Sequence, residues 1–212
     1  MTDNAKTILC YGDSNTWGYI PGTGERHPRS KRWVNILQSK LGEDYEVISE
    51  GCNSRTTTLD DPDNVDKNGM TYLLPCLVSH KPINLVILML GTNDAKAKFN
   101  VSAFQIASQL EELINVIQKS QCGLNNASPK VLLISPPIIK VTPGALQKGY
   151  KGADIKSKEF GKYYQEVAHK YGCDFLNSAE IIESSDTDGY HFEPSEHAKL
   201  AESIYNKINN TY

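Results

Sequence analysis

The sequence predicts an α/β protein in which a parallel sheet of about five strands is covered by helices on both faces. Five short apolar runs, rich in β-branched residues, recur along the 212 residues. They are apolar throughout rather than at alternate positions, which is typical of strands buried on both faces. Helical patterns alternate with them, and this alternation favours right-handed crossovers between parallel strands.

Each apolar run has the length of one strand and ends in small or polar residues. In doubly wound sheets, ligands bind beyond the carboxyl ends of the strands, so those ends are where functional residues are expected. The predicted strands are KTILCYG from Lys6, YEVISEG from Tyr45, INLVILMLG from Ile83, KVLLISPP from Lys130 and GCDFLN from Gly172.

Four amphipathic helices are predicted between and after these strands. RWVNILQSKLG ends at Gly42, a typical C-terminal stop, and SAFQIASQLEELINVIQKS opens with Ser102 and Gln105 in capping-box spacing. SKEFGKYYQEVAHKYG precedes the last strand, and PSEHAKLAESIYNKI closes the chain. Their apolar faces comprise Trp33, Ile36, Leu37 and Leu41; Phe104, Ala107, Leu110, Ile114 and Ile117; Phe160, Tyr164, Val167 and Tyr171; and Leu200, Ile204 and Ile208.

Two long stretches without periodicity, GYIPGTGERHPRSK and PPIIKVTPGALQKGYKGADIK, are expected to be loops at the functional edge. The chain shows no internal repeat, low-complexity segment or interdomain linker. A single domain over residues 1–212 is therefore expected, since this length suits one large core.

Composition excludes several functions. With 22 basic against 25 acidic residues, the charges are scattered and the net charge is −3, so no nucleic-acid partner is expected. No apolar run has the length of a membrane span, and the N-terminal residues lack the order of a signal peptide. Five widely spaced cysteines indicate neither a disulfide framework nor a zinc ribbon. We therefore expect a soluble cytoplasmic protein without membrane contact.

The first strand ends in CYGDSNTWGY, which places Ser14 at the functional edge. The glycine spacing fits neither a P-loop nor a dinucleotide-binding fingerprint, and the stretch is not a Gly-x-Ser-x-Gly elbow. Ser14 is thus either a turn or capping residue or a nucleophile on a tight turn.

A serine nucleophile needs a base, an acid that orients the base, and donors for an oxyanion. Asp188 and His191 lie three residues apart before the last helix, although Asp-Gly is also a common turn. Gly51 and Asn93 follow the second and third strands and are candidate oxyanion donors, through a backbone N–H and a side-chain amide. A structural role as a turn or capping residue can explain each of these residues alone. It does not explain why all of them lie at strand ends.

No metal site is expected. An EF-hand alignment of SSDTDGYHFEPSE puts Ser184 and Ser195 where carboxylates are needed. His191 and His197 have no Cys or His cluster to complete a set of ligands.

In this order, GDSNTWG, SEGCNSRTT, GTND and DGYHF resemble the four motif blocks of the SGNH hydrolases, also called GDSL esterases. The resemblance runs from about Ile8 to the end of the chain and is strongest to the arylesterase and acyltransferase branch. It implies a flavodoxin-like α/β/α sandwich and hydrolysis, or transfer, of short acyl groups such as acetate from small esters, without a cofactor.

The resemblance assigns the roles residue by residue. It makes Ser14 the nucleophile, His191 the general base and then acid, and Asp188 the residue that orients it. By the same resemblance, the oxyanion hole would consist of the backbone N–H groups of Ser14 and Gly51 and the side-chain amide of Asn93. Family members also suggest a homo-oligomer in which the loop VTPGALQKGYKG narrows a neighbour's entrance.

Two further residues are candidates for substrate binding. Trp17 would wall the acyl pocket, or be a packed core residue; Arg55 would steer a polar leaving group, or form a structural ion pair. Other substrate classes stay open: a carbohydrate deacetylase, a thioesterase or a lysophospholipase with the same site. A non-catalytic binding module on this fold is the alternative of a different kind.

Overall fold

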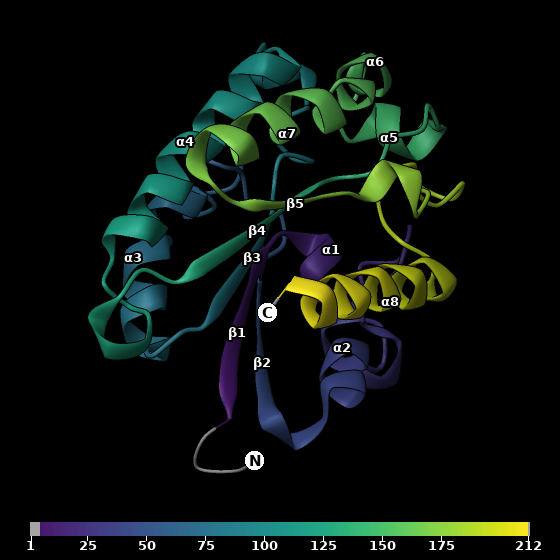
Figure 1. Ribbon diagram of the computed structural model, residues 1–212. Helices are drawn as coiled ribbons and strands as arrows, with labels where there is room; N and C mark the ends of the chain where they lie inside the picture. Colours follow the sequence, from purple (N-terminus) through teal and green to yellow (C-terminus); the bar gives the residue numbers. More distant parts are fainter. Residues whose placement is uncertain (1–4, 212) are drawn as a thin grey trace.

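The computed structural model describes residues 5–211, and its centre is one sheet of five parallel strands in the order β2-β1-β3-β4-β5 (Figure 1). The start of the chain, on which the signal-peptide expectation partly rests, lies outside that range. The predicted parallel sheet is confirmed. The strands are β1 (Lys6–Gly12), β2 (Tyr45–Gly51), β3 (Leu85–Met89), β4 (Lys130–Ser135) and β5 (Asp174–Asn177).

Helices cover both faces of the sheet and make it the middle of three layers. Helices α3 (Gly69–His80), α4 (Ala103–Lys119) and α7 (Phe160–Tyr171) pack on one face, and α2 (Trp33–Leu41) and α8 (Pro194–Thr211) on the other (Figure 1). Each face has its own cluster of buried apolar side chains. The sheet is therefore buried on both sides, as the continuous apolar runs predict.

The strand order reverses at β1, and this reversal fixes where a site can form. β1 pairs with β2 on one side and with β3 on the other. The connection after β1 leads to β2, and the connection after β2 returns to β3 on the opposite side of β1. Gly12, the last residue of β1, is in register with Gly51 and Met89. Loops diverge at such a reversal and leave a crevice beyond the carboxyl ends of the strands.

Local sequence signals explain the helix boundaries. Ser102 accepts a hydrogen bond from the Gln105 backbone N–H, and the Gln105 side chain accepts one from the Ser102 N–H, which is the predicted capping box. The predicted apolar stripe of α4 is wrong at Phe104, whose side chain is 58 % exposed. Ile106 and Leu113 face the core in its place, because the buried face lies slightly further round the helix.

The periodicity predicts neither α3 nor the two short helices in the second predicted loop. α3 carries exposed Leu74 and Val78 opposite its buried face and Pro75 in its interior, and both features blur the helical pattern. The second predicted loop contains α5 (Pro143–Gln147) and α6 (Ala153–Lys158). Thr142 caps α5 with Pro143 at its first position, a start signal that the sequence does contain.

Candidate active site

Ser14 is the first residue of α1 (Ser14–Trp17), a single helical turn directly after β1. The Asp13 carboxylate caps this turn by accepting a hydrogen bond from the Asn15 N–H at 2.9 Å. Gly18 ends the turn with a φ of 93°, a conformation that side chains disfavour. The turn holds the Ser14 hydroxyl at the carboxyl edge of the sheet, where the strand order reverses.

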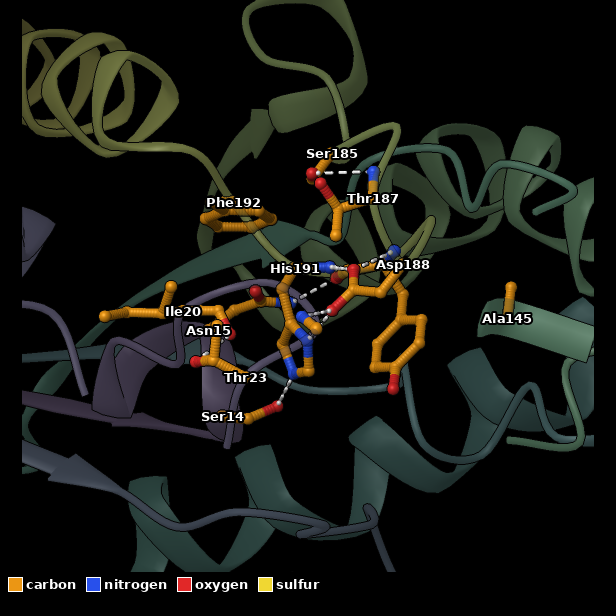
Figure 2. A network of polar contacts seen from close by, with 12 residues as sticks. Ser14, Asn15, Ile20, Thr23, Ala145, Ser185, Thr187, Asp188, His191 and Phe192 are labelled. Carbon is orange, nitrogen blue, oxygen red and sulfur yellow. Dashed lines mark hydrogen bonds and ion pairs between the residues drawn. The ribbon is translucent and has the colours of Figure 1, made fainter. Parts of the chain in front are cut away.

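A continuous hydrogen-bonded chain joins Ser14 to the loop before α8 (Figure 2). His191 Nε2 lies 2.9 Å from the Ser14 Oγ, and His191 Nδ1 lies 2.7 Å from the Asp188 Oδ2. All three side chains are buried. Because a carboxylate only accepts, Nδ1 carries the imidazole proton, and the bare Nε2 accepts from the serine hydroxyl.

The surroundings of His191 and Asp188 determine the protonation states of these two side chains. Burial lowers the pKa of His191 below its usual value, helped by the positive charge of Lys96 and opposed by the hydrogen bond to Asp188. Burial raises the pKa of Asp188, but its hydrogen bonds with His191 and with the backbone outweigh this and leave that pKa below the usual value. At neutral pH the pair is therefore a carboxylate and a neutral imidazole.

The Asp188 carboxylate is held by backbone donors as well as by the histidine. Its Oδ1 accepts from the N–H groups of Tyr190 and His191, and its Oδ2 accepts from the N–H of Gly22 at 3.0 Å. Gly22 belongs to the first long loop after α1. That loop therefore ties Asp188 to the segment that carries Ser14, although Gly22 and Asp188 are 166 residues apart along the chain.

Gly51 ends β2 and packs against the turn that carries Ser14. A Cβ at this position would lie 2.2 Å from the backbone nitrogen of Trp17, so no larger residue fits. The sequence-based reason for a glycine was close approach to a substrate oxygen. In the structure the backbone of α1 approaches Gly51, and this contact brings the ends of β1 and β2 together. The approach of a substrate oxygen to the Gly51 N–H stays a prediction.

Asn93 follows β3 and lies with Ser14 and His191 in the wall of a cavity of about 110 Å³. Its side-chain Nδ2 donates to the Arg55 carbonyl at 3.0 Å, and its Oδ1 accepts from the Tyr150 hydroxyl at 3.3 Å. These two bonds fix the orientation of the amide. The contact to the Arg55 carbonyl uses one of the two N–H groups of the Asn93 amide.

Two contacts at the site were missed by sequence reasoning. Tyr19 stacks on the His191 ring with centroids 4.1 Å apart, and the Asn15 side-chain amide donates to the Tyr190 carbonyl at 3.0 Å. Asn15 occupies the position of the leucine in the Gly-Asp-Ser-Leu motif after which GDSL esterases are named. Its bond joins the turn that carries Ser14 to the loop that carries His191. The only available signals were the positions of these residues beside Ser14 and His191.

The structure does not bring Trp17 and Arg55 to the cavity at Ser14. The Trp17 indole is half-buried and packs under the Arg26 guanidinium at 4.8 Å. Arg55 is buried, donates to the carbonyls of Gly12 and Glu50, and lines a separate cavity of about 560 Å³. Arg55 thus ties the ends of β1 and β2 together through backbone carbonyls. It forms no structural ion pair, the alternative given above, within residues 5–211.

One group of side chains in residues 5–211 has the composition of a metal site. Glu50, Cys76 and His80 offer ligand atoms within 4.8 Å of one another, and His80 Nε2 lies 2.8 Å from the Glu50 carboxylate. None of the three lines the cavity at Ser14. The expectation that the chemistry needs neither metal nor cofactor stays a prediction.

A serine, a histidine and an aspartate joined in series at the carboxyl edge of a doubly wound sheet define a serine hydrolase. The GDSL-like lipase/acylhydrolase family profile matches residues 10–199. The chain belongs to this family, as its motif blocks predict, and is a carboxylic ester hydrolase.

Solved structures of esterases are similar over nearly the whole chain. An M. smegmatis aryl esterase is 35 % identical, with a TM-score of 0.93, over 98 % of this chain and 100 % of that one. Est24, a carbohydrate acetylesterase from Sinorhizobium meliloti, is 34 % identical with the same TM-score and coverage. An acetylxylan esterase of Xylanibacter ruminicola is 26 % identical over 95 % of this chain, which spans 43 % of that relative's length.

None of the helices between residues 5 and 211 combines the length and apolarity that crossing a bilayer requires.

Proposed function

We propose that Ser14 is the nucleophile of an esterase, with His191 as its general base and Asp188 as the residue that orients the base. The observation that carries this proposal is the unbroken hydrogen-bonded series from Asp188 through His191 to the Ser14 Oγ. His191 takes the hydroxyl proton as Ser14 attacks the ester carbonyl, then gives it to the departing alcohol. Water, activated by the same histidine, releases the acyl group from Ser14.

The tetrahedral oxygen is stabilised by the backbone N–H groups of Ser14 and Gly51 and by the Asn93 amide. The contact between Gly51 and α1, together with the two bonds that orient Asn93, supports this assignment. Donors fixed before the reaction stabilise the developing charge without reorganisation.

The proposed substrates are small esters of short acyl groups such as acetate. The small cavity at Ser14 supports this, as does the similarity to an aryl esterase and to esterases that act on acetylated carbohydrates. Carbohydrate acetates are the second candidate, favoured by the name of Est24. Comparing kcat/KM for aryl acetates, acetylated sugars and acetyl-CoA separates these classes; a clear preference for acetyl-CoA would contradict both.

The enzyme is proposed to act as one domain in the cytoplasm and to pass acyl groups to alcohols as well as to water. Its five cysteines are free, which suits a reducing compartment.

A homo-oligomer is proposed through the exposed apolar residues Val141, Leu146 and Ile155 around α5 and α6. Light scattering at micromolar concentration tests it, and a monomer would contradict it.

Covalent labelling tests the proposed nucleophile. A fluorophosphonate should add to the native protein at one adduct per chain, seen by intact mass, and should not add to Ser14→Ala. Folded native protein that gives no adduct at neutral pH would show that Ser14 is not activated. The non-catalytic binding module would then be the better description.

Replacing Asn93 with alanine should lower kcat for p-nitrophenyl acetate by about 10²-fold to 10³-fold, the cost of removing one oxyanion donor. KM should change much less, because the amide binds the oxyanion of the transition state more strongly than the ground-state carbonyl. Steady-state kinetics separates the two constants. A loss confined to KM would assign Asn93 to substrate binding instead.

The acid limb of the pH profile should reflect His191. The base works only when neutral, so kcat/KM should fall as the pH drops through the pKa of His191. Burial and the charge of Lys96 hold that pKa below its usual value of about 6.5. The pH at which kcat/KM falls to half of its maximum should therefore lie below 6.5. Rates between pH 4 and 8 measure this, and a midpoint above 6.5 would contradict it.

A further inference from the structure

The charged side chains that line the cavity at Ser14 are all of the basic type. Two of the residues that line it, Lys96 and Lys148, are cationic, and none is an aspartate or a glutamate. The catalytic carboxylate Asp188 lies behind His191 and is already bound to it. A bound ester therefore meets positive charge and meets no carboxylate in the cavity wall.

Lys96 is the more unusual of the two lysines because it is half-buried and forms no ion pair within residues 5–211. Its ammonium lies 5.5 Å from the centroid of the Tyr150 ring, which is a cation–π contact. Burial lowers the pKa of Lys96, and repulsion from Lys98 adds to this effect. An unpaired charge at this depth costs free energy, and such groups gather at functional sites.

The carboxylates that act on Lys96 from a distance are engaged elsewhere. Asp61 is bound by Lys98, which also pairs with Asp63 at 2.9 Å. Asp13 caps α1, and Asp94 accepts from the backbone and hydroxyl of Thr57. Lys96 thus keeps its capacity to bind an anion from the cavity side.

We propose that Lys96, assisted by Lys148, binds a carboxylate carried by the ester substrate, so that this enzyme prefers acidic esters to neutral esters of the same shape. The inference rests on the proposed function of the same site and adds a substrate class to it. The small cavity suits a carboxylate close to the scissile bond. That carboxylate belongs either to the alcohol half or to the acyl half of the ester.

Two matched substrate pairs distinguish the halves. The pair 4-acetoxybenzoate and methyl 4-acetoxybenzoate varies the charge in the alcohol half, whereas methyl hydrogen succinate and dimethyl succinate vary it in the acyl half. In each pair the measured quantity is the ratio of kcat/KM for the charged ester to kcat/KM for its neutral counterpart. Comparing the ratio between variants cancels the intrinsic reactivities of the two esters.

Lys96→Met should lower this ratio by about 10-fold in one of the two pairs, the loss of one charge-assisted contact. Lys96→Arg should restore most of it. Lys119→Met is the matched control, because it removes the same charge from the exposed end of α4 and should leave the ratio as in the native protein. Added salt should lower the native ratio and affect the Lys96→Met ratio less.

Native and Lys96→Met ratios that agree within about twofold in both pairs would overturn the proposal, as would an equal fall in Lys119→Met. Turnover of p-nitrophenyl acetate by the native protein reports separately on the proposed esterase activity. A protein that hydrolyses this neutral ester yet shows no ratio dependent on Lys96 refutes only the acidic-ester inference. A protein that hydrolyses no ester refutes the function.

Discussion

Ser14→Ala is expected to reduce kcat for p-nitrophenyl acetate by at least about 10⁴-fold. The alanine removes the only atom that forms the acyl-enzyme, so acyl transfer is left to water held by the remaining groups. The Ser14 Oγ is the hydroxyl that lies 2.9 Å from His191 Nε2. Some residual rate should persist, because the oxyanion donors still act.

The control for Ser14→Ala is Ser108→Ala. The Ser108 hydroxyl bonds to the Phe104 carbonyl within α4, away from the cavity, and alanine suits a helix. This variant should keep the native rate. Equal rates for Ser14→Ala and the native protein, with unchanged circular dichroism, would exclude the serine mechanism.

Asp188→Asn should reduce kcat by about 10⁴-fold, as expected when the orienting carboxylate of a triad becomes an amide. The shape is conserved, but an amide N–H would face His191 Nδ1, which lies 2.7 Å from the Asp188 Oδ2. The ring would then carry its proton on Nε2, where it could no longer accept the Ser14 hydroxyl proton. Fluorophosphonate labelling should slow in parallel, since it needs the same activated serine.

Asp186→Asn is the matched control for Asp188→Asn. Asp186 lies two residues earlier in the same loop and pairs on the surface with Lys140 at 2.8 Å. Exposed pairs of this kind contribute little to stability. A comparable loss of activity in both variants would point to distortion of the loop rather than to the histidine's proton position.

Local signals account for much of the fold. The inner strands β1, β3 and β4 are recognisable because nearly all of their residues are buried, and the edge strands β2 and β5 are only partly buried. Helix α4 is recognisable because its cap and stripe are local features. The hydrophobic periodicity does not predict helix α3, because its exposed face also carries apolar residues and a proline interrupts the pattern. Whether a neighbour covers an apolar residue is a long-range property that periodicity does not report.

The site was predictable in its residues rather than in its contacts. Ser14, His191 and Asp188 meet as the motif order indicated, because parallel strands end at one edge. The cavity wall includes Lys96 and Tyr150, whose sequence surroundings carry no comparable signal. Trp17 shares a helical turn with Ser14, yet its ring faces Arg26 rather than the cavity.

The sequence by itself determined the layered α/β class, the hydrolase family and the residues of the proposed triad, because these depend on short patterns and on their order along the chain. Only the tertiary structure decided which neighbours those residues have: Gly51 against the backbone of α1, Asn15 on the histidine loop, and Lys96 in the same cavity wall as Ser14. Such contacts join segments far apart in sequence. They are set by packing and by the pairing of buried polar groups, which no local pattern encodes.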